Sequence, residues 1–211
     1  MKAHRTLLDV EELATRMSCR LIQFREDPNS ILMSLLQSGL SLSSILSGML
    51  HLPRHVFIAE NLRAPCKCPC SIGALTETNF IFMDERVIAR QQWPYRELRA
   101  YVEKEMQTRR AEIARQKQTH RTPYGLPELG GRNVLFVNDG TAASTALIAS
   151  IESFRRLGAG RIVLAVPSDS FQDRSDIEDR VDELVVANAT EFTSGQHRAE
   201  QISSLDSPRV A

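Results

Sequence analysis

Apolar residues in the first part of the chain recur at spacings that predict alternating helices and strands. Val10, Leu13, Met17 and Leu21 fall on one helical face, and Asp9 precedes them as a cap, so a helix is expected to begin there. Short apolar runs between turn residues are typical of buried strands. The further elements predicted here are a strand over Ile31–Leu36, a helix with Leu42, Ile45, Leu46, Met49 and Leu50 inward, a strand over His55–Ala59, and a β-hairpin over Ser71–Met83 with its turn near Thr78-Asn79.

A long polar helix over Tyr95–Gln118 is predicted next. Its charged residues, among them the favourable Glu105–Arg109 pair, are interpreted as a solvated face. Its apolar residues form a stripe that we interpret as core, although such a stripe would also serve a partner. The stripe consists of Leu98, Val102, Met106 and Ile113.

Strands and helices then alternate, after a loop rich in glycine and proline over His120–Arg132. This alternation favours a parallel sheet with right-handed crossovers, which is a doubly wound α/β fold. The predicted elements are a strand over Val134–Val137, a turn over Asn138–Thr145, a helix over Ala146–Leu157, a strand over Ile162–Val166, a helix over Asp169–Arg180 and a strand over Leu184–Ala187.

The composition excludes several classes of protein. The chain has 211 residues, which fits one domain, and its 26 basic residues balance 26 acidic ones. Zero net charge argues against a dedicated binder of nucleic acid or of anionic membranes. No run of about 18 apolar residues exists, and Met1–Val10 lacks the apolar stretch of a signal peptide. We therefore expect a cytoplasmic protein, with a flexible tail over residues 201–211.

The turn Asn138–Thr145 carries the clearest candidate chemistry. It links a strand directly to a helix, and ligands of open parallel sheets bind at such strand ends. The first N–H groups of a helix and its positive dipole end attract phosphate, and small residues let the phosphate approach. An acid at the strand end, here Asp139, can hold ribose hydroxyls or a metal shell. The alternative from the pattern alone is an ordinary turn capped by Ser144 or Thr145.

Val134–Thr145, with the following helix and the strand Ile162–Pro167, resembles the ribose-phosphate-binding motif of type I phosphoribosyltransferases. That motif is four apolar residues, two acids, a short spacer and Thr-Gly-x-Thr. The chain most resembles bacterial members of the family that carry a long helical insert before the motif. Further matches lie at the pyrophosphate loop (Leu36–Leu42), at Leu62, Ala64, Pro65 and Ile72-Gly73-Ala74, at the insert (Met83–Arg121), and at the last strand and closing segment (Asp182–Gln196).

The resemblance implies a Rossmann-like doubly wound sheet with a helical insert over about residues 84–121 and a small β-hairpin, in a single domain over residues 1–200. It implies transfer of phosphoribosyl from phosphoribosyl pyrophosphate to a nitrogenous base, with Mg²⁺ as cofactor, by a homodimer. The residues that it assigns are Asp139 and Asn138 as catalytic, Gly140, Thr141, Ala142, Ala143, Ser144 and Thr145 as phosphate-binding, and Gln37, Ser38 and Gly39 as the pyrophosphate loop.

Several positions depart from the family's pattern. The first acid is replaced by Asn138, which carries no charge, and Thr-Gly-x-Thr reads Ala143-Ser144-Thr145-Ala146. Gln37-Ser38-Gly39 stands where the family has Arg-Gly-Gly, and Glu60-Asn61 where it has Arg-Lys. Cationic contacts to phosphate are therefore replaced at three positions, once by an acid. Because electrostatic stabilisation usually dominates such catalysis, these losses predict a weak or silent site.

Three cysteines, Cys66, Cys68 and Cys70, stand within five residues. Thiolates this close could bind Zn²⁺ or another soft metal, with Cys19 as a fourth ligand if the first helix packs beside them. The spacing is C-x-C-x-C rather than the more diagnostic C-x-x-C, so we favour incidental cysteines of a loop.

Two functions therefore remain open from the sequence. The first is an active phosphoribosyltransferase with a small-molecule phosphoribosyl or nucleotide ligand. The second is a catalytically silent relative that senses a nucleotide or phosphate, or binds a partner. A third, structural interpretation is a dimer whose interface is the long helix.

Overall fold

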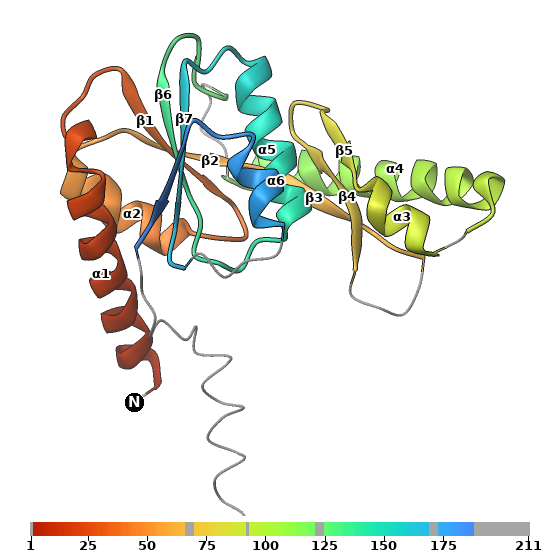
Figure 1. Cartoon of the computed structure of the whole chain (residues 1–211), viewed down its shortest axis with the longest axis horizontal. Helices are drawn as coiled ribbons and strands as arrows, with labels where there is room; N and C mark the ends of the chain where they lie inside the picture. Colours follow the sequence, from red (N-terminus) through yellow and green to blue (C-terminus); the bar gives the residue numbers. More distant parts are fainter. Residues whose placement is uncertain (1, 66–69, 92, 121–124, 169–172, 188–211) are drawn as a thin grey trace, which may run out of the picture.

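The computed structural model describes residues 2–65, 70–91, 93–120, 125–168 and 173–187, which form a larger and a smaller β-sheet with their helices (Figure 1). In chain order the elements are α1 (Lys2–Arg20), the 3-10 turn η1 (Ile22–Phe24), β1 (Ser30–Leu35), α2 (Leu40–Leu50), β2 (Arg54–Phe57), β3 (Ala59–Arg63), β4 (Ser71–Thr76), β5 (Ile81–Met83), α3 (Glu85–Gln91), α4 (Tyr95–His120), β6 (Asn133–Val137), α5 (Ser144–Arg156), β7 (Arg161–Val166), α6 (Arg174–Glu178) and β8 (Glu183–Val186).

The larger sheet is parallel, with the strand order β2-β1-β6-β7-β8. In chain order, β2 is added on one side of β1, and β6, β7 and β8 are then added in turn on the other side of β1. The direction of winding therefore reverses between β1 and β6, where Met33 pairs with Phe136 and Ser34 with Val137. Such a reversal is a topological switch point, at which the carboxyl ends of adjacent strands open a crevice. The predicted doubly wound α/β fold is confirmed.

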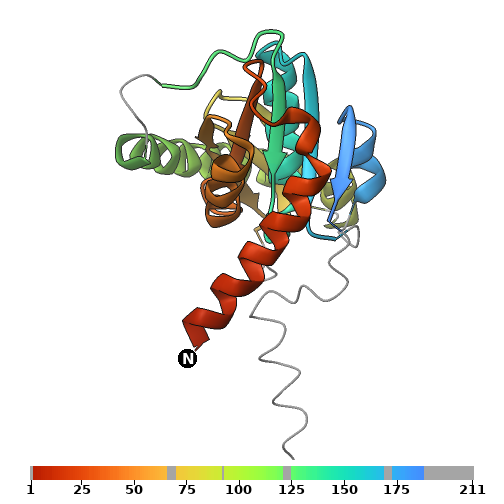
Figure 2. The same ribbon diagram turned by 90° about the vertical axis from the view of Figure 1, so that its left-hand side faces the viewer.

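Helices cover both faces of this sheet because its strands alternate between them. In β6, Leu135 and Val137 pack with α1 and α2, whereas Val134 and Phe136 pack with α5 and α6. All four side chains are completely buried. Figures 1 and 2 show the resulting three layers, with α1 and α2 on one side of the sheet and α5 and α6 on the other.

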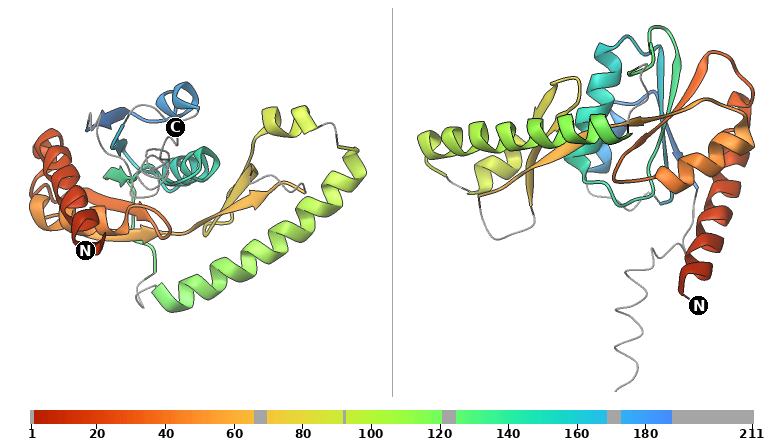
Figure 3. Two further views of the ribbon diagram at one scale, coloured as in Figure 1. Left: turned by 90° about the horizontal axis from the view of Figure 1, so that it is seen from below. Right: turned by 180° about the vertical axis from the view of Figure 1, so that it is seen from behind.

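The smaller sheet is antiparallel, with the order β3-β4-β5, and α3 and α4 lie against it (Figure 3). The apolar stripe of α4 packs on this sheet: Ile113 is buried, and Leu98, Val102 and Met106 are partly buried in the same cluster. The interpretation of the stripe as core is therefore confirmed. Both helices lie within the segment that was expected to be a helical insert.

The chain passes from the larger sheet to the smaller one across Ile58. Glu77 binds this residue twice: the Ile58 N–H donates to Glu77 Oε1 (2.9 Å), and the Glu77 N–H donates to the Ile58 carbonyl (2.9 Å). Lys117 of α4 donates to the Glu77 carbonyl (2.8 Å). The two sheets and α4 therefore meet at one hydrogen-bonded joint.

Two of the predicted boundaries are wrong. The first helix begins at Lys2, so Asp9 lies inside it and does not cap it, because the helix-forming residues before Asp9 extend the helix. The predicted strand His55–Ala59 is divided, because Ala59 belongs to β3 of the other sheet. An apolar run shows that a segment is buried, but not in which sheet.

The short helix α3 was not predicted. Asp84 starts it by accepting the N–H groups of Arg86 (3.0 Å) and Val87 (3.1 Å) on Oδ1. Of the helix predicted over Asp169–Arg180, the structure describes Arg174–Glu178, and the expected tail over residues 201–211 lies outside the described residues. Within the described ranges, no helix has the length and apolar character needed to cross a membrane.

We expect Phe154→Ala to lower the free energy of unfolding by about 3–5 kcal/mol. Phe154 is fully buried, and its ring packs edge-on against Phe57 and Phe136, with ring centroids 4.7 and 5.1 Å away. Urea denaturation measures the change. Leu157→Ala, at an exposed position after the same helix, is the control and should change stability by less than about 0.5 kcal/mol. Equal losses in the two variants would contradict this account of the core.

Candidate functional site

Two loops meet at the switch point: Gln37–Gly39 after β1, and Asn138–Ala143 after β6. Gly39 allows this approach. Its φ is +81°, and a Cβ at this position would lie 2.8 Å from the carbonyl oxygen of Val137. Any side chain would therefore both strain the backbone and push the loops apart. The predicted pyrophosphate loop and the predicted ribose-phosphate turn are thus brought together.

Asp139 joins the two loops. Its Oδ2 accepts the N–H of Gly39 (2.9 Å), and its Oδ1 accepts the hydroxyl of Ser38 (2.6 Å). The hydroxyl and the N–H of Thr141 also donate to Oδ1, at 2.6 and 3.0 Å. Burial acts to raise the pKa of Asp139, but the hydrogen bonds from Ser38, Thr141 and Gly39 outweigh it and lower that pKa. The carboxylate is therefore charged at neutral pH, and both of its oxygens are engaged.

Asn138, which precedes Asp139 at the end of β6, is 2% exposed. Its Oδ1 accepts the N–H of Gly140 and lies 3.4 Å from the hydroxyl of Ser38. Because Gly140 needs an acceptor, this contact sets the orientation of the amide. The Nδ2 of Asn138 is buried and has no hydrogen-bond partner among the residues that the structure describes. Asn138 thus acts on the backbone of the turn, and its amide N–H₂ points to no acceptor.

The turn continues into α5, whose N-cap residue is Ala143 in an extended conformation, without a side-chain cap. Ala142 and Ala143 line a cleft, whereas Thr145 points elsewhere. The Thr145 hydroxyl lies 3.1 Å from Asn61 Oδ1 and 2.9 Å from the Ser71 hydroxyl. Thr145 therefore ties α5 to the smaller sheet, and the side chains of the predicted phosphate site do not all face one volume.

A cleft of about 180 Å³ lies between the two loops. Its polar lining comes from Gln37, Ser38, Asn61 and Thr141, and the rest is Leu35 and four alanines, Ala59, Ala142, Ala143 and Ala146. A second cleft of about 260 Å³ lies on the other side of the Gln37–Gly39 loop, against α1 and α2, and includes Asp139. Among the residues with described side chains that line either cleft, none is Lys, Arg or His. The site therefore offers neutral hydrogen-bonding groups and one carboxylate.

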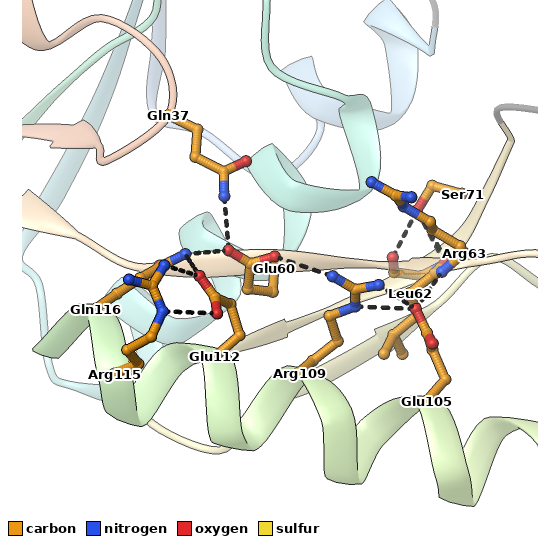
Figure 4. A network of polar contacts seen from close by, with 11 residues as sticks. Gln37, Glu60, Leu62, Arg63, Ser71, Glu105, Arg109, Glu112, Arg115 and Gln116 are labelled. Carbon is orange, nitrogen blue, oxygen red and sulfur yellow. Dashed lines mark hydrogen bonds and ion pairs between the residues drawn. The ribbon is translucent and has the colours of Figure 1, made fainter.

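A buried carboxylate, Glu60 of β3, lies behind the Gln37–Gly39 loop (Figure 4). Glu60 Oε1 accepts the side-chain amides of Gln37 (2.6 Å) and of Gln116 from α4 (2.7 Å). Arg109 Nη1 lies 3.6 Å from Glu60 Oε2, and Arg109 also pairs with Glu105 (2.8 Å). The prediction that this pair belongs to a solvated face is wrong, because the Arg109 side chain is only 17% exposed.

Sequence reasoning missed Arg109 and Gln116 as parts of the site. Only the spacing of these residues in the sequence could have indicated this role. Together with Glu105 and Glu112, they lie on one face of α4 at helical spacing, as Figure 4 shows. Hydrogen bonds from Arg115 and Gln116 lower the pKa of Glu112 to about 2, so this carboxylate is also charged. The network around Glu60 therefore holds three carboxylates (Glu60, Glu105 and Glu112) and two guanidiniums (Arg109 and Arg115), with an acid where the family would place a cation.

The residues of the site do not fit a dedicated Mg²⁺ site. Mg²⁺ is usually held by one or two carboxylates together with substrate phosphates. Asp139 has both oxygens engaged by donors of the protein, and Asn138 in the neighbouring position supplies no charge. For the predicted Zn²⁺ site, Cys66 and Cys68 lie outside the described residues, and no group of three metal-binding side chains occurs within those residues. The Zn²⁺ site stays a prediction.

No family model matches this chain. Among solved structures, the chain resembles TT1426 from Thermus thermophilus at 20% identity over 86% of this chain and 82% of that one, with a TM-score of 0.55. A hypoxanthine phosphoribosyltransferase from Staphylococcus aureus matches at 11% identity over 85% and 73% of the two chains, with a TM-score of 0.48. APRTase from Giardia lamblia, complexed with 9-deazaadenine, matches at 14% identity over 84% and 77%, with a TM-score of 0.45.

Solved phosphoribosyltransferases are among the structures that this chain resembles. At these identities the likeness concerns the fold. The activity and the ligand must be argued from the chain's own residues.

We expect Asp139→Asn to destabilise the protein by about 2 kcal/mol at pH 7, because the amide cannot accept all the donors that the carboxylate accepts. Since folding lowers the pKa of Asp139, its contribution is complete above the unfolded pKa of about 3.9 and is lost as the pH falls through the folded value.

Urea denaturation of both proteins between pH 2 and 7 tests this. The stability difference should be largest above about pH 5 and should shrink below about pH 4. Asp179→Asn, at an exposed position, is the control and should show no such pH dependence. A difference that stays constant down to pH 2 would show that Asp139 does not join the loops as a carboxylate.

Proposed function

We propose that this chain is a protein of the phosphoribosyltransferase fold that binds a small ribose-phosphate or nucleotide ligand without transferring a phosphoribosyl group. The ligand occupies the cleft between Gln37–Gly39 and Thr141–Ala143. The protein acts by binding, as a sensor of its ligand.

The lining of the cleft supports binding of a sugar phosphate. The hydroxyl oxygens of Ser38 and Thr141, whose hydrogens are donated to Asp139, can still accept hydrogen bonds from sugar hydroxyls, and the Asn61 side-chain amide can donate one. The turn ends at α5, a helix of 13 residues whose first turn carries no acidic side chain. Its positive dipole end favours one phosphate group beside Ala142 and Ala143. The volume of about 180 Å³ is below the roughly 300–1,000 Å³ of common ligand pockets, so the cleft suits one ring rather than an extended molecule.

The observation that carries the proposal is that, among the described residues that line the two clefts, none has a cationic side chain. Departure of pyrophosphate from ribose places several negative charges on the leaving group, and catalysis of that step needs cations or free donors aimed at it. Here Ser38 and Gly39 already donate to Asp139, so both Asp139 oxygens already accept hydrogen bonds from the protein. Removing a single such donor costs on the order of 10²–10³ in rate, so the combined losses favour a silent site.

The homodimer and the cytoplasmic location that the sequence suggested stay predictions. Light scattering over a range of protein concentrations would determine the oligomeric state. Active transfer to a base is the competing function, and the assay below distinguishes the two.

We expect titration calorimetry to detect ribose 5-phosphate at a Kd between micromolar and millimolar, and we expect a pyrophosphate-release assay with Mg²⁺ to show no turnover of phosphoribosyl pyrophosphate with adenine, guanine, hypoxanthine, xanthine or uracil. Ala142→Asp is the control, because a carboxylate in the turn would repel the phosphate and weaken binding at least tenfold; since Ala142 also packs against the core, urea denaturation should first show that the variant is folded. Release of pyrophosphate by the wild type, but not by that variant, would instead establish an enzyme.

A further inference from the structure

Three donors of the Gln37–Gly39 loop are committed to the protein's own carboxylates, and a fourth is committed to a backbone carbonyl. The Gln37 side-chain amide donates to Glu60 Oε1 (2.6 Å). The Ser38 hydroxyl and the Gly39 N–H donate to Asp139, at 2.6 and 2.9 Å. The Ser38 N–H donates to the carbonyl of Leu35 (3.3 Å). An anionic group arriving at this loop would have to displace an acceptor of the protein from each of these donors.

Glu60 is built into this position and is not an incidental surface charge. It is 6% exposed, and it is held from α4 by Gln116 (2.7 Å to Oε1) and Arg109 (3.6 Å to Oε2). Arg109 lies closer to Glu105, at 2.8 Å, so one guanidinium is shared by two carboxylates. Arg115 of α4 also interacts electrostatically with Glu60, although its own ion pair is with Glu112 (2.6 Å). Two guanidiniums of α4 thus serve three carboxylates and compensate their charge in part, and charge in a buried setting is poorly screened by solvent.

The position of Glu60 in β3 explains how it acts. Its sequence neighbours Ala59 and Asn61 line the cleft, so by strand alternation the Glu60 side chain points to the opposite face, toward α4 (Figure 4). Gln37 is the connection between the two faces, because it lines the cleft and bonds Glu60. Glu60 thus turns the Gln37 donor away from the cleft.

We propose that Glu60 is a positioning residue that, through Gln37, excludes a pyrophosphate group from the cleft, so that the site selects ribose monophosphates over ligands that also carry pyrophosphate. This inference rests on the proposed function. It specifies which class of ligand the site binds. It also means that α4, which holds Glu60 in place, contributes to the specificity of the site.

Ribose 5-phosphate and phosphoribosyl pyrophosphate form a matched pair of probes, since both carry ribose and its 5-phosphate and only the second carries pyrophosphate. The test is titration calorimetry of both probes, with Mg²⁺, against the wild type and three variants. Glu60→Gln removes the charge but keeps an acceptor for Gln37 and Gln116. Glu105→Gln is the matched control, because Glu105 pairs with the same Arg109 but does not contact Gln37.

The wild type should bind ribose 5-phosphate at least as tightly as phosphoribosyl pyrophosphate. Glu60→Gln should tighten binding of the pyrophosphate ligand about tenfold, as expected for removal of one partly screened charge, and should leave ribose 5-phosphate within about twofold. Glu105→Gln should change neither affinity by more than about twofold. A merely structural role of Glu60 would change both affinities together.

Gln37→Arg keeps the test decisive if Glu60→Gln does not fold, because Gln37 is exposed. Glu60 should capture the new guanidinium, so binding of phosphoribosyl pyrophosphate should improve at most twofold. A tenfold gain in Gln37→Arg alone, or no gain in a folded Glu60→Gln that still binds ribose 5-phosphate, would overturn the inference and leave the proposed function standing. Failure of every protein to bind either probe would overturn both.

Discussion

The carboxylate of Asp139 determines how the two central strands of this protein end. Parallel strands deliver their carboxyl ends to one edge of a sheet, and the loops that follow carry N–H groups and hydroxyls with no partner of their own. Asp139 accepts the donors of Ser38 and Gly39 from the neighbouring loop, together with those of Thr141. The arrangement works only because Gly39 brings its backbone against Val137. Asp139, which the family motif would use to bind a ligand, therefore satisfies the hydrogen-bond donors at this edge of the sheet.

The helical insert takes part in this edge as well. Arg109 and Gln116 belong to a helix that packs on the smaller sheet, yet their polar groups meet Glu60 and, through it, the loop after β1. A helix whose apolar stripe faces one sheet can thus present its adjoining polar positions to a loop of the other. The α4 helix is therefore connected to the site through Glu60 and Gln37, although none of the described cleft-lining residues belongs to it.

Much of this fold could be predicted from the sequence, because strands such as Val134–Val137 are short apolar runs that a turn and an amphipathic helix follow. The proximity of the Gln37–Gly39 loop to Asp139 could also be expected, because the carboxyl ends of adjacent parallel strands lie at the same edge of a sheet. The role of Thr145 did not, because a hydroxyl at a helix start can turn toward the phosphate or, as here, toward Asn61 and Ser71. Nor did the burial of Arg109 follow, because its contact with Glu60 joins positions far apart in the chain, which no local pattern records.

The hydrogen-bonded joint at Ile58 limits where the smaller sheet could be separated from the rest of the chain. The smaller sheet and its helices stand between β2 and β6 in the chain, and such units are usually joined by linkers that tolerate cutting. At the first of the two crossings a single residue, Ile58, connects the sheets, and Glu77 binds both its N–H and its carbonyl. A graft made at this point would take the Ile58 N–H away from the buried Glu77 carboxylate. A segment that is moved to another protein as one piece must therefore be larger than the helical insert, and it must include both Ile58 and Glu77.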